Sequence, residues 1–92
     1  MESYLINKDE LLTVISMGQQ SITVRGAGGF EYHAKCLPTH SSLQAMPLQL
    51  QDILRVMHVN PDRSAVVERV THGSPDGCQY MLYDYVPVSK HD

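Results

Sequence analysis

The chain has 92 residues, of which 42% are hydrophobic, and a formal net charge of -3. This length predicts a single domain near the small end of the range that folds alone, and the apolar content argues against long disordered segments. The negative charge disfavours nucleic acid and anionic membranes as the main partners. No apolar run approaches the roughly 20 residues that span a bilayer, and no signal-peptide pattern is visible. Two cysteines do not make a disulfide framework, so we expect free thiols and a cytoplasmic location.

Residues 7–18 carry a pattern that predicts an α-helix. Asn7 and Glu10 have the spacing of a capping box, which satisfies two backbone amides at a helix start. Gly18 stands where a helix commonly ends. The predicted apolar stripe comprises Leu11, Val14 and Ile15.

A first β-hairpin is predicted after this helix. Residues 20–25 and 30–36 alternate between apolar and polar side chains, which indicates two half-buried strands. The glycine-rich segment 26–29 joins them and reads as a turn. A phosphate-binding loop would instead lead from a strand into a helix. The cations expected on the outer face of this hairpin are Arg25, His33 and Lys35.

The second half of the chain repeats the order of the first. Pro47 fits the first turn of a second helix, which Asn60 and Pro61 would end. Strands are predicted over 64–71 and 78–88, joined by a turn at 74–77. The apolar stripe of the second helix would comprise Leu50, Ile53, Leu54 and Met57.

The predicted fold is therefore a single α+β domain over residues 1–92 with the order α-β-β-α-β-β. Its four strands form one antiparallel sheet, and both helices pack on one face. The halves are 7–38 and 39–88, followed by a polar tail at 89–92. Residues 10–15 align with 52–57, and residues 29–32 align with 77–80, as an internal αββ duplication would require.

The strand at 78–88 has two apolar or aromatic faces, whereas a half-buried strand has one wet face. Its predicted core face carries Cys78, Tyr80, Leu82 and Val86. The outer face of the second hairpin predicts a protein contact surface. The residues of that surface are Val66, Val70, Met81, Tyr83 and Tyr85. In the alternative, the 39–46 connection or an N-terminal arm at 4–6 covers this face.

The sequence offers little support for catalysis or metal binding. His33, Cys36 and His40 form the nearest approach to a metal site, but His33 and Cys36 point to opposite faces of a strand. Both cysteines are predicted to face the core, where thiols are usually inert. We therefore predict no catalytic residue, no metal ligand and no cofactor.

The favoured interpretation is a small, non-enzymatic interaction or regulatory module. It would bind another protein or a second copy of itself through the outer face of the second hairpin. The alternative is a nucleic-acid-binding regulator that uses Arg25, His33 and Lys35. No motif in the chain is specific for one family.

Overall fold

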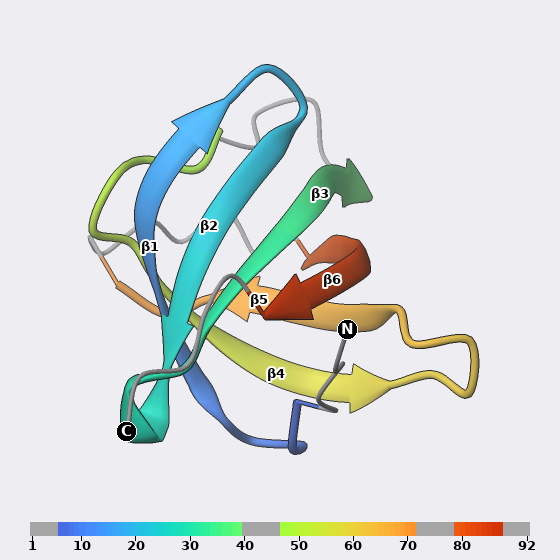
Figure 1. Cartoon of the computed structure of the whole chain (residues 1–92). Helices are drawn as coiled ribbons and strands as arrows, with labels where there is room; N and C mark the ends of the chain where they lie inside the picture. The colour runs from blue at the N-terminus through green and yellow to red at the C-terminus, as the bar shows by residue number, and fades with distance from the viewer. Residues whose placement is uncertain (1–5, 40–46, 72–78, 88–92) are drawn as a thin grey trace.

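The computed structural model describes residues 6–39, 47–71 and 79–87. Within these ranges the chain forms a closed barrel of antiparallel strands in the order β1-β2-β3-β6-β5-β4 (Figure 1). The strands are β1 (Leu11–Gly18), β2 (Ser21–Gly26), β3 (Glu31–Thr39), β4 (Ile53–Val59), β5 (Ala65–Arg69) and β6 (Gln79–Pro87). A 3₁₀ turn, η1 (Ala27–Gly29), joins β2 to β3. The connection at 40–46, the arm at 4–5, the turn at 74–77 and the tail at 89–92 lie outside the described ranges.

The predicted α+β fold with two helices on a four-stranded sheet is wrong. The segments predicted as helices form β1 and β4, and the described residues contain no α-helix. Leu12 and Val14 are buried while Thr13 between them is half-buried, which is the period of a strand. The exposed Leu11 and the half-buried Ile15 add apolar residues that imitate a helical stripe. The β-branched residues of these segments pack well on a pleated surface and favour strands.

The capping-box bond exists, but it closes a turn that leads into a strand. The Asn7 amide donates to Glu10 Oε1 at 3.0 Å, and the Glu10 amide donates to the Asn7 carbonyl at 3.1 Å. Asp9 has φ of 68°, in the left-handed region that an α-helix excludes. The chain therefore reverses at Asp9 and enters β1.

The same turn precedes β4. The Gln49 amide donates to Asp52 Oδ2 at 2.6 Å, and Gln51 has φ of 71°. At the seam between β1 and β4, Asp9 and Gln51 each donate a backbone bond of 2.7 Å, to Val56 and Val14 respectively. The halves are therefore matching β-β-β units, and the predicted αββ arrangement is wrong.

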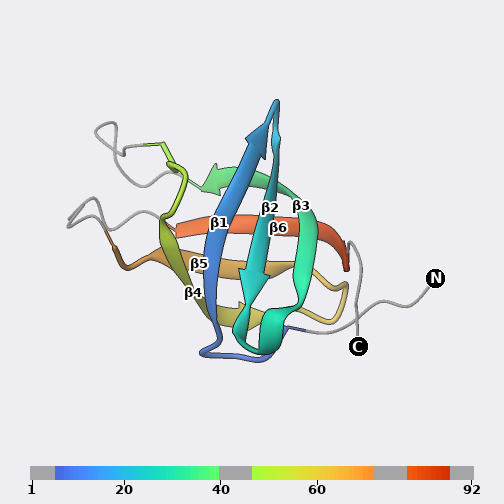
Figure 2. The same cartoon turned by 60° about the vertical axis from the view of Figure 1, so that its left-hand side comes forward.

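The irregularities of β1 and β4 also match. The pairing of β1 with β2 shifts register between Val14 and Ser16, and that of β4 with β5 shifts between Val56 and His58. Such bulges increase local twist and help a sheet to close. In Figure 2, β1 and β2 stand upright with opposite directions, while β5 and β6 cross behind them.

The core fills the barrel with inward-facing side chains of all six strands. Ile6 and Leu48, which precede the two matching turns, are buried with it. The buried apolar strand residues are Leu12, Val14, Ile22, Val24, Tyr32, Ala34, Leu54, Val56, Ala65, Val67, Tyr80, Leu82 and Tyr85. In the described part of the chain, no helix is long and apolar enough to cross a membrane.

Candidate functional site

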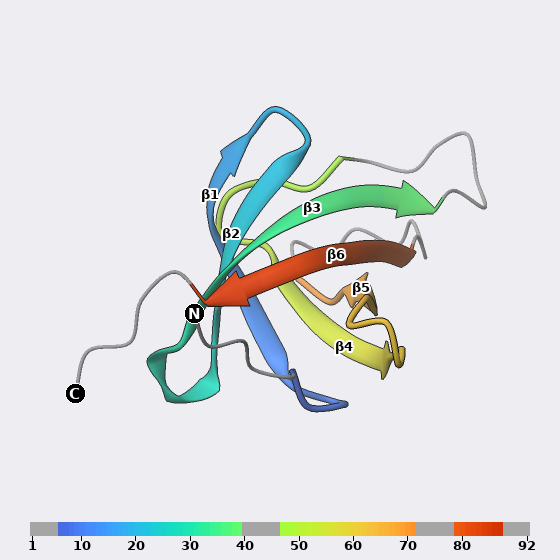
Figure 3. The ribbon, with the colours of Figure 1, turned by 45° about the vertical axis from the view of Figure 1, so that its right-hand side comes forward.

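A bulge in β6 divides the aromatic side chains of the predicted contact surface. β3 and β6 lie side by side with opposite directions (Figure 3). Their register moves from Lys35 opposite Tyr83 to His33 opposite Val86, so two residues of β6 face one residue of β3. Asp84 takes up the extra position with φ of 53°, which aspartate tolerates better than most residues. Strict alternation is lost at this point, and the two tyrosines that flank Asp84 face opposite sides of the barrel wall.

Tyr85 lies in the core and is no part of the outer surface, so its predicted place is wrong. Its side chain is 0% exposed, and its ring packs edge-on against Tyr32 with centroids 6.0 Å apart and an interplanar angle of 85°. Burial raises the pKa of the Tyr85 hydroxyl, while the backbone of Ile6 and the charge of Arg63 lower it.

The other outward residues of β6 form an apolar surface with their neighbours. Met81 lies opposite Val66 of β5 on one side and opposite Leu37 of β3 on the other. Leu37 is 45% exposed, and Val66 and Met81 are half-buried. Tyr83 is half-buried beside Lys35. We call Leu37, Val66, Met81 and Tyr83 the β3–β6–β5 patch.

Leu37 is the patch residue that sequence reasoning missed. The first hairpin was expected to end at Cys36, because Pro38 follows closely, whereas β3 continues to Thr39. Val70, a predicted member of the surface, follows β5 and is exposed. Its amide donates to the Ile53 carbonyl at 2.8 Å, and Glu68 stands between it and Val66 along the chain. Val70 is therefore separated from the patch residue Val66 by Glu68 and does not belong to the patch.

The cations of the nucleic-acid alternative are exposed on the outer side of β2 and β3. Arg25 Nη2 lies 2.7 Å from Glu31 Oε2, so the carboxylate offsets its charge. His33 lies opposite Thr23, and Lys35 lies opposite Tyr83. The structure therefore spreads these three residues along β2 and β3 rather than gathering them at one point.

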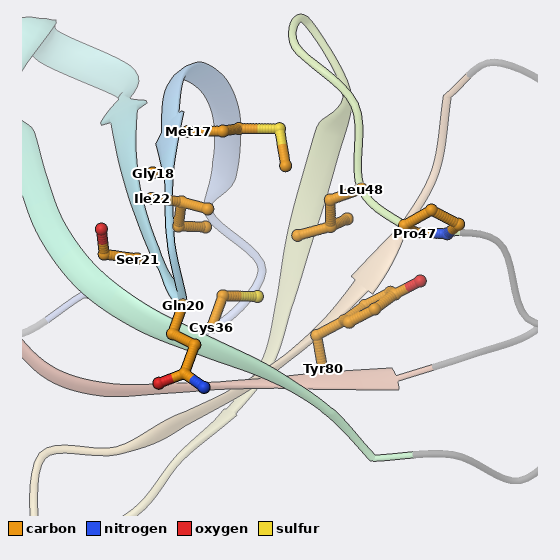
Figure 4. Close-up of a pocket in the computed structure, with 9 residues that line it drawn as sticks. All are labelled: Met17, Gly18, Gln20, Ser21, Ile22, Cys36, Pro47, Leu48 and Tyr80. Carbon is orange, nitrogen blue, oxygen red and sulfur yellow. The ribbon is translucent and has the colours of Figure 1, made fainter.

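A separate cavity of about 160 Å³ opens where the β1–β2 turn meets the segment before β4 (Figure 4). The side chains of Met17, Ile22 and Leu48 project into it. Cys36, on the opposite side of β3 from Leu37, also lines it, and the ring of Tyr80 lies beside Leu48. The remaining lining residues are Gly18, Gln20, Ser21 and Pro47.

Cys36 is free in the structure, and burial raises its pKa to about 12. Its thiol is therefore protonated at neutral pH and is a poor nucleophile or metal ligand. No group of three or more histidine, cysteine, aspartate or glutamate side chains is placed to hold a metal among the described residues. His40 and Cys78 lie outside those ranges.

One buried ion pair was not predicted. Arg69 Nε lies 3.1 Å from Asp52 Oδ2, with side chains 2% and 0% exposed, and Arg69 also donates to the Pro47 carbonyl. At the matching position of the first half, Leu12 of β1 faces Gly26 where Leu54 of β4 faces Arg69. A side chain at Gly26 would collide with the Glu10 carboxylate. Sequence reasoning could not find the pair, because the partners meet only when β4 pairs with β5.

No family model, curated protein or solved structure matches the chain.

Proposed function

We propose that this barrel is a non-enzymatic interaction module that binds a second copy of itself through the β3–β6–β5 patch. The observation that carries the proposal is the apolar row formed by Leu37, Met81 and Val66 across three adjacent strands. Contiguous exposed apolar area on a small domain commonly marks a contact surface, and tyrosine and methionine are enriched there.

The closed sheet supports contact through side chains. The two three-stranded units, β1–β2–β3 and β4–β5–β6, pair with each other at both edges. β1 pairs with β4, and β3 pairs with β6. A barrel has no free strand edge at which a partner could add a strand. A partner that lies against the described strands therefore contacts side chains on the outside of the barrel wall, where the β3–β6–β5 patch is apolar.

The charges around the patch favour a second copy as the partner. Lys35 adjoins the patch on β3. Glu68, whose carboxylate pairs with Arg55, adjoins it on β5, on the far side of the Leu37–Met81–Val66 row. A two-fold contact uses the same surface on both subunits, so it can bring the Lys35 ammonium of each subunit to the Glu68 carboxylate of the other, where Arg55 already offsets part of the charge. The nucleic-acid alternative has less support, because Glu31 offsets the charge of Arg25.

Leu37→Lys tests the proposal, and Leu50→Lys is the matched control. Both leucines are exposed, at 45% and 56%, but Leu50 lies in the turn before β4 and outside the patch. A lysine at position 37 would place an ammonium in a desolvated contact, so we expect association to weaken by about tenfold or more. Leu50→Lys should leave association unchanged.

Sedimentation equilibrium between about 10 µM and about 1 mM protein measures association at physiological salt. Circular dichroism of both variants confirms that the fold is retained. A wild-type chain that is monomeric throughout this range would overturn the proposal. Equal effects of the Leu37 and Leu50 substitutions would also overturn it, because the patch would then have no special part.

A further inference from the structure

We propose that the cavity lined by Met17, Ile22, Cys36, Leu48 and Tyr80 is a binding site for one aromatic ring of phenol size. The argument is the internal match between the two halves of the barrel. Tyr85 of the second half fills one space, against Tyr32 and Ile6. The counterpart space, against Tyr80 and Leu48, is open because Leu37 of the first half, the counterpart of Tyr85, points outward.

The walls of the two spaces correspond. Val24 lies opposite Tyr32 in the first half, and Val67 lies opposite Tyr80 in the second, so the two tyrosines are counterparts. Ile6 and Leu48 are counterparts because each precedes one of the matching turns, and both are buried.

Tyr85 shows how a ring fits such a space. It packs edge-on against Tyr32, and Arg63, in the β4–β5 turn, donates to its backbone carbonyl at 3.4 Å. The backbone of Ile6 lies close to the Tyr85 hydroxyl and lowers its pKa. Tyr85 therefore lies between Tyr32, Ile6 and the β4–β5 turn that contains Arg63. The open cavity presents the same three features: Tyr80, Leu48 and the β1–β2 turn.

The first half lacks a ring because β3 lacks the β6 bulge. Leu37 follows Tyr32 by the same five positions that separate Tyr85 from Tyr80. The pairing of Cys36 with Leu82 and of Leu37 with Met81 is regular, so Leu37 stays on the outer side. The counterpart of the space that Tyr85 fills is therefore left as a cavity.

The size and chemistry of the cavity suit a single ring. Its volume is about 160 Å³. An engineered apolar cavity of about 150 Å³ in another protein binds benzene. The sulfur atoms of Met17 and Cys36 and the ring of Tyr80 favour an aromatic guest over a saturated one. The ring can belong to a free phenol or to a tyrosine side chain of another chain.

Titration of the whole chain with 4-methylphenol, followed by NMR of labelled methyl groups, tests the proposal. We expect saturable shifts at Ile22 and Leu48 and none at Ile6, the counterpart of Leu48. The saturated analogue 4-methylcyclohexanol should bind more weakly by roughly twofold to tenfold, because it loses the aromatic contacts. N-acetyltyrosinamide distinguishes the sources: equal or tighter binding indicates a side chain, and binding of 4-methylphenol alone indicates a free phenol.

Filling and emptying variants complete the experiment. Cys36→Phe should abolish binding by occupying the cavity, and Met17→Phe serves the same purpose if the first variant does not fold. Tyr85→Ala is the positive control, because it empties the second space and should add a site with shifts at Ile6. If this variant gains that site while the Ile22 and Leu48 methyls never respond, the proposal is overturned. Binding that both filling variants leave intact would also overturn it.

This site is independent of the proposed association surface. Cys36 faces the cavity, whereas its neighbour Leu37 belongs to the outer patch. Leu37→Lys should therefore leave 4-methylphenol binding intact, and Cys36→Phe should leave self-association intact. Failure of one proposal consequently leaves the other standing.

Discussion

The buried ion pair between Asp52 and Arg69 permits a sharp test of the fold. Asp52→Asn removes the negative charge but keeps a side-chain oxygen that can accept the Gln49 amide, so the turn bond can persist. Arg69 is then left with its charge 2% exposed and without its carboxylate. Losing one partner of a buried pair typically costs about 3–5 kcal/mol, because the other charge stays desolvated.

That loss is large for a domain of this size. Small domains are stable by about 5–15 kcal/mol in total. With an unfolding entropy of about 2.1 cal/mol/K per residue, the 92 residues give about 0.19 kcal/mol/K. Asp52→Asn should therefore lower the melting temperature by about 15–25 °C. Urea denaturation followed by circular dichroism measures the free energy of unfolding directly.

The first half of the barrel supplies the matched control. Glu10 accepts the Asn7 amide in the same kind of turn, but its carboxylate lies against Gly26 rather than an arginine. Glu10→Gln should therefore cost less than about 1 kcal/mol, as ordinary surface changes do. If Asp52→Asn costs no more than Glu10→Gln, the reasoning about the buried charge is refuted.

Two further predictions concern β3 and β6. In a Cys78→Ser background, native Cys36 should react slowly with a thiol reagent at pH 8 and rapidly after unfolding, because burial raises its pKa to about 12; rapid native labelling would contradict its placement. At the bulge, Asp84→Val should lower the free energy of unfolding by about 1–2 kcal/mol. Asp84→Gly should lower it by less, since glycine accepts the left-handed conformation; equal losses in urea denaturation would argue against the bulge.

Sequence patterns located the strands of both hairpins. The predicted strands at 20–25, 30–36, 64–71 and 78–88 overlap β2, β3, β5 and β6. These segments alternate clearly or are bounded by glycine and proline, and local residue preferences decide such cases. The Asn7–Glu10 contact was also predicted, because it is local, but it was interpreted as the start of a helix.

The helix predictions failed because local signals fit two structures. The Asn7–Glu10 bond occurs both at helix starts and in the turn that the chain forms. What decides between them is the left-handed backbone of Asp9 and the pairing of β1 with β4, whose partners are far apart in sequence. The residue pattern of segment 7–18 alone therefore does not predict the pairing of β1 with β4.

The candidate sites depended on backbone irregularities that composition does not reveal. Strict alternation places Tyr83 and Tyr85 on one face, and the left-handed Asp84 reverses the side that Tyr85 takes. The cavity is likewise invisible in the sequence, because it exists where β3 lacks such a bulge. Val66, Met81 and Tyr83 are half-buried between core residues, as alternation along β6 up to Asp84 predicts for the last two. Their part in a contact surface stays a prediction.

The two seams of the barrel have a consequence for how the chain folds. Each meander, β1–β2–β3 and β4–β5–β6, is built from neighbouring strands, but each seam joins strands from different halves. Pairing strands that are distant in sequence lowers the conformational entropy of the chain before the core contacts have formed. This entropy loss slows folding. Each meander alone exposes one side of its sheet, so neither half has a finished interior. Folding therefore requires the two three-stranded units to associate within one chain. Its rate depends on the length and stiffness of the segment that connects β3 to β4.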